Sequence, residues 1–135
     1  MPTVIRKFNP PVSVGERRRD ILHAVTWQVR AATWSPPTDV YETERDYVTR
    51  VEVAGMREAD FEITFEDGLL LIAGARPDIQ ERRAYHQMEI RFGQFSVAVP
   101  APGPVKIESA HAEYLDGFLT VTLPKARPTF IVSEG

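Results

Sequence analysis

The chain has 135 residues, of which 43% are hydrophobic and 26% charged, and it contains no cysteine. This length allows one domain of modest core with tails, and the missing cysteines exclude disulfides and thiolate chemistry. No run approaches the roughly 18 apolar residues of a membrane helix, so we expect no membrane span. The first residues lack the apolar stretch of a secretory signal. The composition is compatible with a reducing cytoplasm, where we expect the protein.

The net charge of −3 is unevenly distributed along the chain. Residues 1–38 hold six Lys/Arg against two Asp/Glu, and residues 39–135 hold ten against seventeen. A basic head on an acidic body can indicate a nucleic-acid-binding arm. The excess here is small beside a typical basic stripe, so we expect no nucleic-acid partner.

The first part of the chain differs from the rest in its pattern. Residues 1–15 contain several prolines and a glycine, and we expect them to be irregular. Residues 16–34 contain neither, and their apolar side chains recur at about 3.6 residues per turn, which predicts a helix. Two interpretations stay open: a helix packed on the body, or an exposed and adaptable apolar arm.

From residue 38 onward the pattern changes to the period of two that is typical of half-buried strands. Strands are expected at residues 39–43, 47–53, 61–66, 69–74 and 94–99, with a short helical turn or loop at 56–60. Gly-containing turns such as Glu66-Asp67-Gly68 separate them. Short strands at this spacing predict an all-β, antiparallel sandwich.

Residues 75–93 interrupt this rhythm. The segment is charged and holds only a short β-like piece, at about residues 84–88. A loop of this length inside a compact domain is usually functional or disordered.

The stretch from Ile107 to Lys125 consists of two β-prone runs around Asp116-Gly117. Asp-Gly is a strong hairpin signal because the second turn residue must tolerate a positive φ. The small Ala112 leaves room for another segment close to the sheet. An ordinary core hairpin has the same pattern.

The tail after Lys125 carries three bulky apolar residues, Phe130, Ile131 and Val132. An apolar triplet at a chain end has no core of its own, so we expect it to dock. Its own domain and a neighbouring molecule are both open as the docking site.

Residues for catalysis or metal binding are not arranged in any known motif. The three histidines, His23, His86 and His111, fall on different expected elements without metal-ligand spacing. There is no nucleophile elbow, phosphate-binding loop or dinucleotide fingerprint. We therefore expect no catalytic residue, no metal, no cofactor and no enzyme.

The hairpin closely resembles the signature of the α-crystallin-domain small heat-shock proteins. The matching residues are Ala112, Asp116, Gly117, Phe118, Leu119 and Leu123-Pro124-Lys125. Further blocks follow in the family's order at residues 39–43, 47–56, 66–74 and 81–86, and at Gly93 and Phe95. The resemblance covers about residues 39–125 and implies an immunoglobulin-like sandwich, with an arm at 1–38 and an extension at 126–135.

What the resemblance implies is an ATP-independent holding chaperone that binds unfolding proteins and suppresses their aggregation under stress. Family members form homodimers, and larger homo-oligomers, by exchanging the loop strand onto the opening strand of a partner. The implied dimer interface consists of Val40, Tyr41, Glu42, Ala84, Tyr85, His86, Gln87, Met88 and Arg91.

The family's tail docks through an Ile-x-Ile/Val motif in a groove of a neighbouring dimer. The corresponding tail residues are Phe130, Ile131 and Val132, and the groove residues are Ile63, Phe65, Ala112 and Tyr114. The N-terminal arm is variable in the family and contributes to client binding and assembly. The implied client-binding residues are Ile21, Leu22, Val25, Trp27, Val29 and Trp34.

Two departures from the family pattern bear on assembly. Ile90 stands where an arginine is common, at the position of the usual dimer-interface ion pair. The Phe130–Val132 tail is a looser version of the docking motif.

The alternative function is a co-chaperone-like β-sandwich that binds one folded protein partner.

Overall fold

The computed structural model describes residues 3–4 and 32–129, and these residues form β-strands and two short 3-10 turns. The strands are β1 (Thr3–Val4), β2 (Thr38–Glu42), β3 (Asp46–Glu52), β4 (Phe61–Glu66), β5 (Leu69–Arg76), β6 (Gly93–Pro100), β7 (His111–Leu115) and β8 (Phe118–Pro124). The 3-10 turns are η1 (Glu58–Asp60) and η2 (Ile107–Ser109). In this part of the chain no helix is long and apolar enough to cross a membrane.

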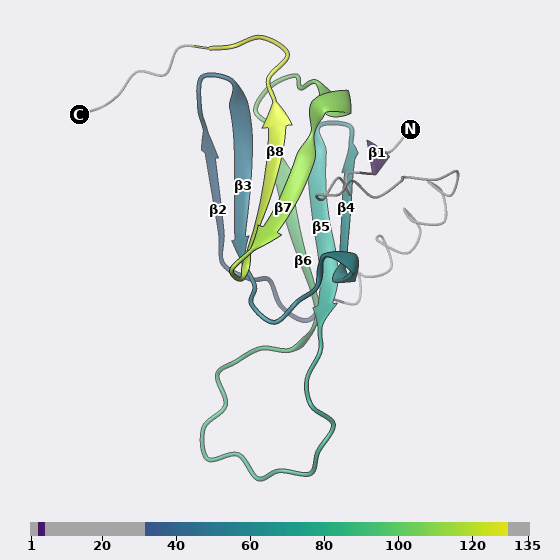
Figure 1. Ribbon diagram of the computed structural model, residues 1–135, viewed down its shortest axis with the longest axis vertical. Coiled ribbons are helices and arrows are strands. Elements are labelled where there is room, and N and C mark those ends of the chain that lie inside the picture. Colours follow the sequence, from purple (N-terminus) through teal and green to yellow (C-terminus); the bar gives the residue numbers. More distant parts are fainter. Residues whose placement is uncertain (1–2, 5–31, 130–135) are drawn as a thin grey trace, which may run out of the picture.

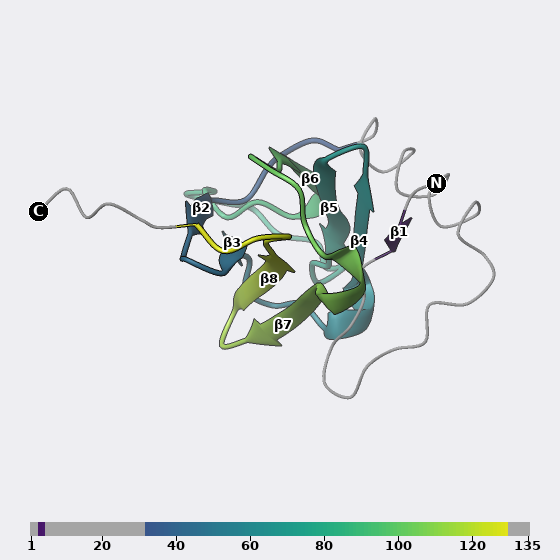
Figure 2. The ribbon, with the colours of Figure 1, turned by 90° about the horizontal axis from the view of Figure 1, so that it is seen from above.

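The strands form two four-stranded antiparallel sheets, in the orders β1-β4-β5-β6 and β2-β3-β8-β7. Seen from above, the two sheets lie as two layers of one sandwich (Figure 2). The predicted all-β sandwich is therefore confirmed. Strands β2 and β7 are the two edge strands of the second sheet. In a single chain, β2 is therefore paired only with β3 and its other edge is free.

The core lies between the sheets and is built from alternate residues of each strand, as the period of two predicts. Its fully buried large side chains are Phe61, Phe95, Ile63, Leu70, Ile72, Leu119, Val51, Val53 and Val121. Phe61 packs edge-on against Phe95, with ring centroids 6.2 Å apart. The same alternation directs the intervening residues outward, and these outward residues form the surfaces described below.

Two hairpins turn through Asp-Gly pairs. At Asp67-Gly68 the φ angles are 51° and 77°, and at Asp116-Gly117 they are 52° and 83°. Positive φ at both central residues matches the right-handed twist of the flanking strands. The register follows from these turns: β4 pairs with β5, and β7 with β8.

The N-terminal region departs from the expectation in two places. Residues 1–15 were expected to be irregular, but Thr3–Val4 form β1 beside β4. The sequence predicts that the helix continues to Trp34. In the structure, Trp34 instead forms a parallel bridge with Phe95, and Thr33 donates its N–H to the carbonyl of Gln94. Pairing with β6 outweighs local helix propensity at these residues. The rest of the predicted helix lies outside the described residues.

Candidate protein-interaction surfaces

The free edge of β2 carries unpaired backbone groups, and the ladder to β3 identifies them. The N–H of Glu52 donates to the carbonyl of Pro37 at 3.0 Å, and the N–H of Thr43 donates to that of Asp46 at 2.9 Å. Bonded pairs alternate in an antiparallel ladder. The backbone N–H and C=O groups of the intervening residues Thr38, Val40 and Glu42 therefore point away from β3.

The side chains of β2 are apolar and exposed at its centre. Val40 is 50% exposed, and its neighbour Tyr41 is exposed to a similar extent. An exposed edge strand with apolar side chains is a template for another strand. Glu42, the third β2 residue predicted for the dimer interface, makes an ion pair with Lys125 of its own chain.

The second part of the predicted dimer interface lies in the loop at residues 77–92. This loop extends beyond the ends of β5 and β6 and forms no strand with its own sandwich (Figure 1). All the predicted interface residues in it, Ala84, Tyr85, His86, Gln87, Met88 and Arg91, are exposed. Met88 and Ile90 are each 66% exposed. In a single chain, the loop and β2 thus both expose apolar side chains to solvent.

Arg76 fastens the base of this loop, a role that its sequence pattern did not indicate. Its Nε donates to the carbonyl of Arg91 at 2.8 Å, and its Nη2 donates to the same oxygen. The guanidinium also lies over the rings of Trp34, at 4.5 Å, and Phe92, at 5.4 Å. A planar guanidinium can donate and stack at the same time. The two ends of the loop are therefore held together while its middle stays exposed.

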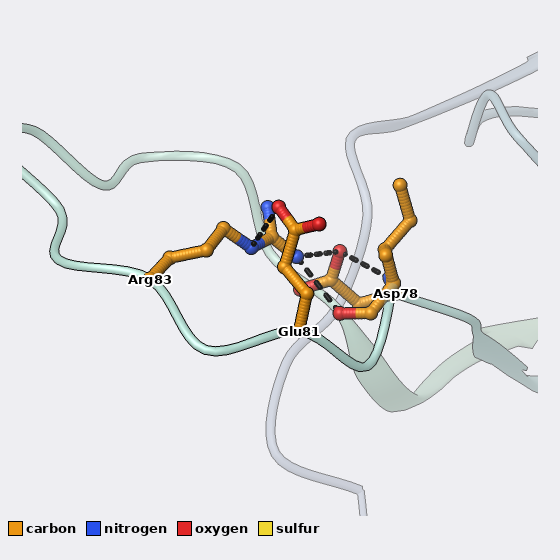
Figure 3. A network of polar contacts seen from close by, with 4 residues as sticks. Asp78, Glu81 and Arg83 are labelled. Carbon is orange, nitrogen blue, oxygen red and sulfur yellow. Dashed lines mark hydrogen bonds and ion pairs between the residues drawn. The ribbon is translucent and has the colours of Figure 1, made fainter.

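A polar network stiffens the first half of the loop (Figure 3). Arg83 makes ion pairs with Asp78 at 3.1 Å and with Glu81 at 3.3 Å, and it donates to the carbonyl of Ile79 at 2.8 Å. The Arg83 guanidinium also lies over the Tyr85 ring at 5.4 Å. Exposed ion pairs contribute roughly 0–1 kcal/mol each. The network therefore shapes the loop before residues 84–88 rather than adding much stability.

The predicted tail groove brings together residues of β4 and β7, which lie in different sheets. Ile63 and Ala112 are buried, whereas Phe65 and Tyr114 are half-buried. The Tyr114 hydroxyl donates to the carbonyl of Val53 at 2.8 Å and accepts the N–H of Met56 at 3.2 Å. Tyr114 is therefore held by its own domain.

A surface hollow of about 320 Å³ lies next to this group of residues. Phe65 lines it, together with Val105 and Ile107 from the segment before β7 and with Pro104. The other three predicted groove residues do not line it. The sequence offered one signal for Val105 and Ile107, since both are apolar residues directly after a proline-rich link.

The root of the tail is fixed at the tip of the β2–β3 hairpin. The N–H of Thr129 donates to the carbonyl of Glu44 at 2.9 Å. Lys125 Nζ lies 2.6 Å from a carboxylate oxygen of Glu42 and donates to the Thr129 hydroxyl at 2.8 Å. The docking residues Phe130, Ile131 and Val132 themselves lie outside the described residues.

Among the predicted client-binding residues, only Trp34 lies in the described part of the chain. Its ring packs on Phe95 at a centroid distance of 5.5 Å, and its Nε1 donates to the carbonyl of Gly93 at 3.1 Å. It therefore lies against the sandwich in this structure. Within the described ranges, no three His, Asp or Glu side chains gather as a metal site.

Comparison with known proteins agrees with this fold. Residues 39–133 match the model of the Hsp20/alpha crystallin family. A 19.0 kDa class II heat shock protein of Oryza sativa is 33% identical over 133 residues, which cover 91% of this chain and 70% of that protein. Small heat shock protein C2 of Rickettsia felis is 29% identical over 92 residues, which cover 67% of this chain and 60% of that protein.

Solved structures resemble the sandwich closely. Heat shock protein 16.0 from Schizosaccharomyces pombe superposes with a TM-score of 0.67 at 28% identity, covering 74% of this chain and 94% of that one. A small heat-shock protein from Xylella fastidiosa gives a TM-score of 0.64 at 25% identity, covering 76% and 95%, and its title describes a distinct high order structure.

These matches define a β-sandwich of the small heat shock protein class. The chain belongs to the Hsp20/alpha crystallin family. Its matches span about 60% of the length of the Rickettsia small heat shock proteins.

Proposed function

We propose that this protein is an ATP-independent holding chaperone that binds unfolding proteins and suppresses their aggregation. Membership of a chaperone family supports this proposal. The structural observation that carries it is the exposed apolar edge of β2, together with a loop in which Met88 and Ile90 are each 66% exposed. Covering apolar surface is favourable by roughly 25 cal/mol per Å², so the β2 edge and the loop can drive assembly, and an apolar arm can hold a client without a nucleotide or a catalytic group.

The first assembly step in this proposal is a homodimer formed by strand exchange. Residues 84–88 of one chain add to the free edge of β2 in the other chain. The outward N–H and C=O groups of Thr38, Val40 and Glu42 supply the hydrogen bonds, and the alternate side chains set the register. An extended segment of five residues matches the five residues of β2 in length.

The second assembly step is docking of the tail residues Phe130, Ile131 and Val132 in the groove of a neighbouring dimer. The bond from Thr129 to Glu44 places the root of the tail on the β2 side of its sheet, and β2 and β7 lie at opposite edges of that sheet. Three strand spacings separate these edges, a distance of about 14 Å. For this separated root of the tail we propose docking on a neighbour, with growth into a larger homo-oligomer, over docking on the same domain.

In this proposal the N-terminal arm supplies the apolar side chains of Ile21, Leu22, Val25, Trp27 and Val29 to clients. A cytoplasmic location fits this role. The alternative, a module for one folded partner, makes a different prediction about which proteins bind.

Size-exclusion chromatography of the protein mixed with a model client tests the two functions against each other. The holding chaperone forms a large soluble complex with the client only when the client is heated, and it does so without ATP. Binding to a native protein without any complex with heated clients would support the folded-partner module instead.

A further inference from the structure

The arm of this chain is anchored at two opposite edges of one sheet. At its beginning, Thr3–Val4 pair with Phe65 and Thr64 of β4. At its end, Thr33 and Trp34 run along β6: the N–H of Thr33 donates to Gln94 and the carbonyl of Trp34 accepts the N–H of Ser96. Because β4 and β6 flank β5 in the β1-β4-β5-β6 sheet, the two anchors lie at opposite edges of this sheet, and residues 5–31 are the stretch of chain that connects them.

The inner face of this sheet is not available for the crossing, because it is filled by the core. The outer face consists of the alternate residues of β4, β5 and β6. Cross-strand neighbours share a face, and the register gives rows of Thr64, Leu71 and Ala98, and of Glu62, Ala73 and Ser96. On β5 this outer set continues through Leu69 and Ala75.

The central strand of this outer face has the composition of a buried surface. Its central strand presents Leu69, Leu71, Ala73 and Ala75, none of which is polar. Thr64 and Ala73 are 0% exposed although they belong to the outward-facing set. Small apolar residues in the middle of a sheet face allow a helix to approach closely, and an apolar stripe on a helix needs such a partner.

We propose that the outer face of β4, β5 and β6 is the docking surface for this chain's own residues 16–31. The sequence predicts an amphipathic helix there, with Ile21, Leu22, Val25 and Val29 on one face. Sixteen helical residues span roughly 24 Å. The four strand spacings from β1 to Trp34 span about 19 Å. The predicted helix is therefore long enough to lie across the sheet between its two anchors.

Charge complements this placement. The predicted helix begins with Arg17, Arg18 and Arg19, and this end follows the anchor on β4. The outer residues of β4 include the half-buried carboxylates Glu62 and Glu66. Arginines near these carboxylates orient the helix with its beginning at β4 and its end at β6. The sequence leaves two arrangements open, a helix packed on the body and an exposed apolar arm. This proposal corresponds to the packed helix.

This surface is distinct from the β2 edge and the loop that the proposed chaperone function uses. A consequence that rests on that function is that Val25 and Val29 become available to clients only after the helix leaves the sheet. The docking itself can be measured without any client, so its test is independent of chaperone activity.

A single introduced cysteine can measure whether this sheet face is shielded from solvent, since the natural chain has no cysteine. The reporter Ala73→Cys is placed in the full chain, and the rate of its reaction with a thiol reagent is measured under native conditions. We expect slow reaction with the natural arm. Val25→Glu, on the apolar face of the predicted helix, should accelerate it about tenfold or more, because a charge on that face opposes docking.

The matched control is His23→Glu, which places the same carboxylate on the opposite face of the predicted helix and should leave the rate unchanged. Equal rates in the Val25→Glu and His23→Glu chains would overturn the proposal. So would rapid reaction of the reporter with the natural arm, or protection that is lost on dilution, which would assign the cover to a second copy.

A reciprocal pair of variants keeps the test valid if Ala73→Cys perturbs folding. Here the reporter is Val25→Cys, and the charge is placed on the sheet as Leu71→Glu. We expect faster labelling of position 25 in Leu71→Glu than in Leu115→Glu, which alters an exposed apolar residue on the other sheet. Equal labelling in both chains would contradict docking on this face.

Discussion

Lys125 Nζ lies 2.6 Å from a carboxylate oxygen of Glu42, and the lysine side chain is only 1% exposed. The same nitrogen donates to Thr129 and lies 5.2 Å from the centre of the Tyr47 ring. A buried ammonium needs such partners because its desolvation is costly. This one side chain therefore connects the end of β2, where a partner strand is proposed to add, to the root of the tail.

Replacing Lys125 by alanine removes all three of these contacts. We expect a loss of about 1.5–3 kcal/mol in the free energy of unfolding, the range for hydrogen bonds to charged groups. Urea denaturation measures this loss. Lys106→Ala is the control, since Lys106 is exposed. An equally small effect of both substitutions would show that Lys125 is not a stabilising connection.

Val40→Pro tests the exchanged strand. The Val40 N–H points away from β3, so proline leaves the chain's own ladder intact while it removes a donor from the free edge. We expect a folded monomer by native mass spectrometry, with the sandwich retained by circular dichroism. Val40→Thr keeps the N–H and should remain a dimer. A Val40→Pro protein that is still dimeric would place the dimer interface elsewhere.

Deleting residues 129–135 tests the docking tail. The deletion removes both the Thr129 anchor and the apolar triplet, so we expect a smaller assembly by light scattering. The substitution Glu134→Gln keeps the triplet and should leave the mass as it is. An unchanged mass after the deletion would exclude tail docking as an assembly contact.

Arg76→Lys tests the fastening of the loop. Lysine keeps the charge but cannot donate from a planar fork or stack in the same way on Trp34. We expect faster amide hydrogen exchange at the two ends of the loop, near residues 77 and 92. Arg82→Lys, an exposed change within the loop, is the control. Equal exchange in both variants would mean that Arg76 does not hold the loop.

The strands of the sandwich could be predicted because their signals are local. Alternation along residues 61–66 and the Asp-Gly pairs at 67–68 and 116–117 depend on neighbours in sequence, and the structure confirms each of them. The pairing of Thr3–Val4 with β4 could not be predicted, because two residues carry no period. The extended course of Trp34 was missed for a related reason: its partner Phe95 lies far away in the sequence.

The candidate surfaces were predictable only in part. Val40 and Met88 were identified through the family resemblance, and the structure finds both exposed, while their pairing across a dimer stays a prediction. The roles of Arg76 and Lys125 depend on contacts between segments that only the folded chain brings together. A charged residue in a strand or after a proline has the same pattern whether it is solvated or buried.

Light scattering of a heated model client, with no ATP present, tests the central claim most directly. The account predicts that the protein at a stoichiometric amount suppresses the rise in scattering, because its apolar surfaces cover those of the unfolding client. The Val40→Pro and tail-deleted variants show whether this activity depends on the dimer and on tail docking. Scattering that rises as fast with the protein as without it would contradict the chaperone function.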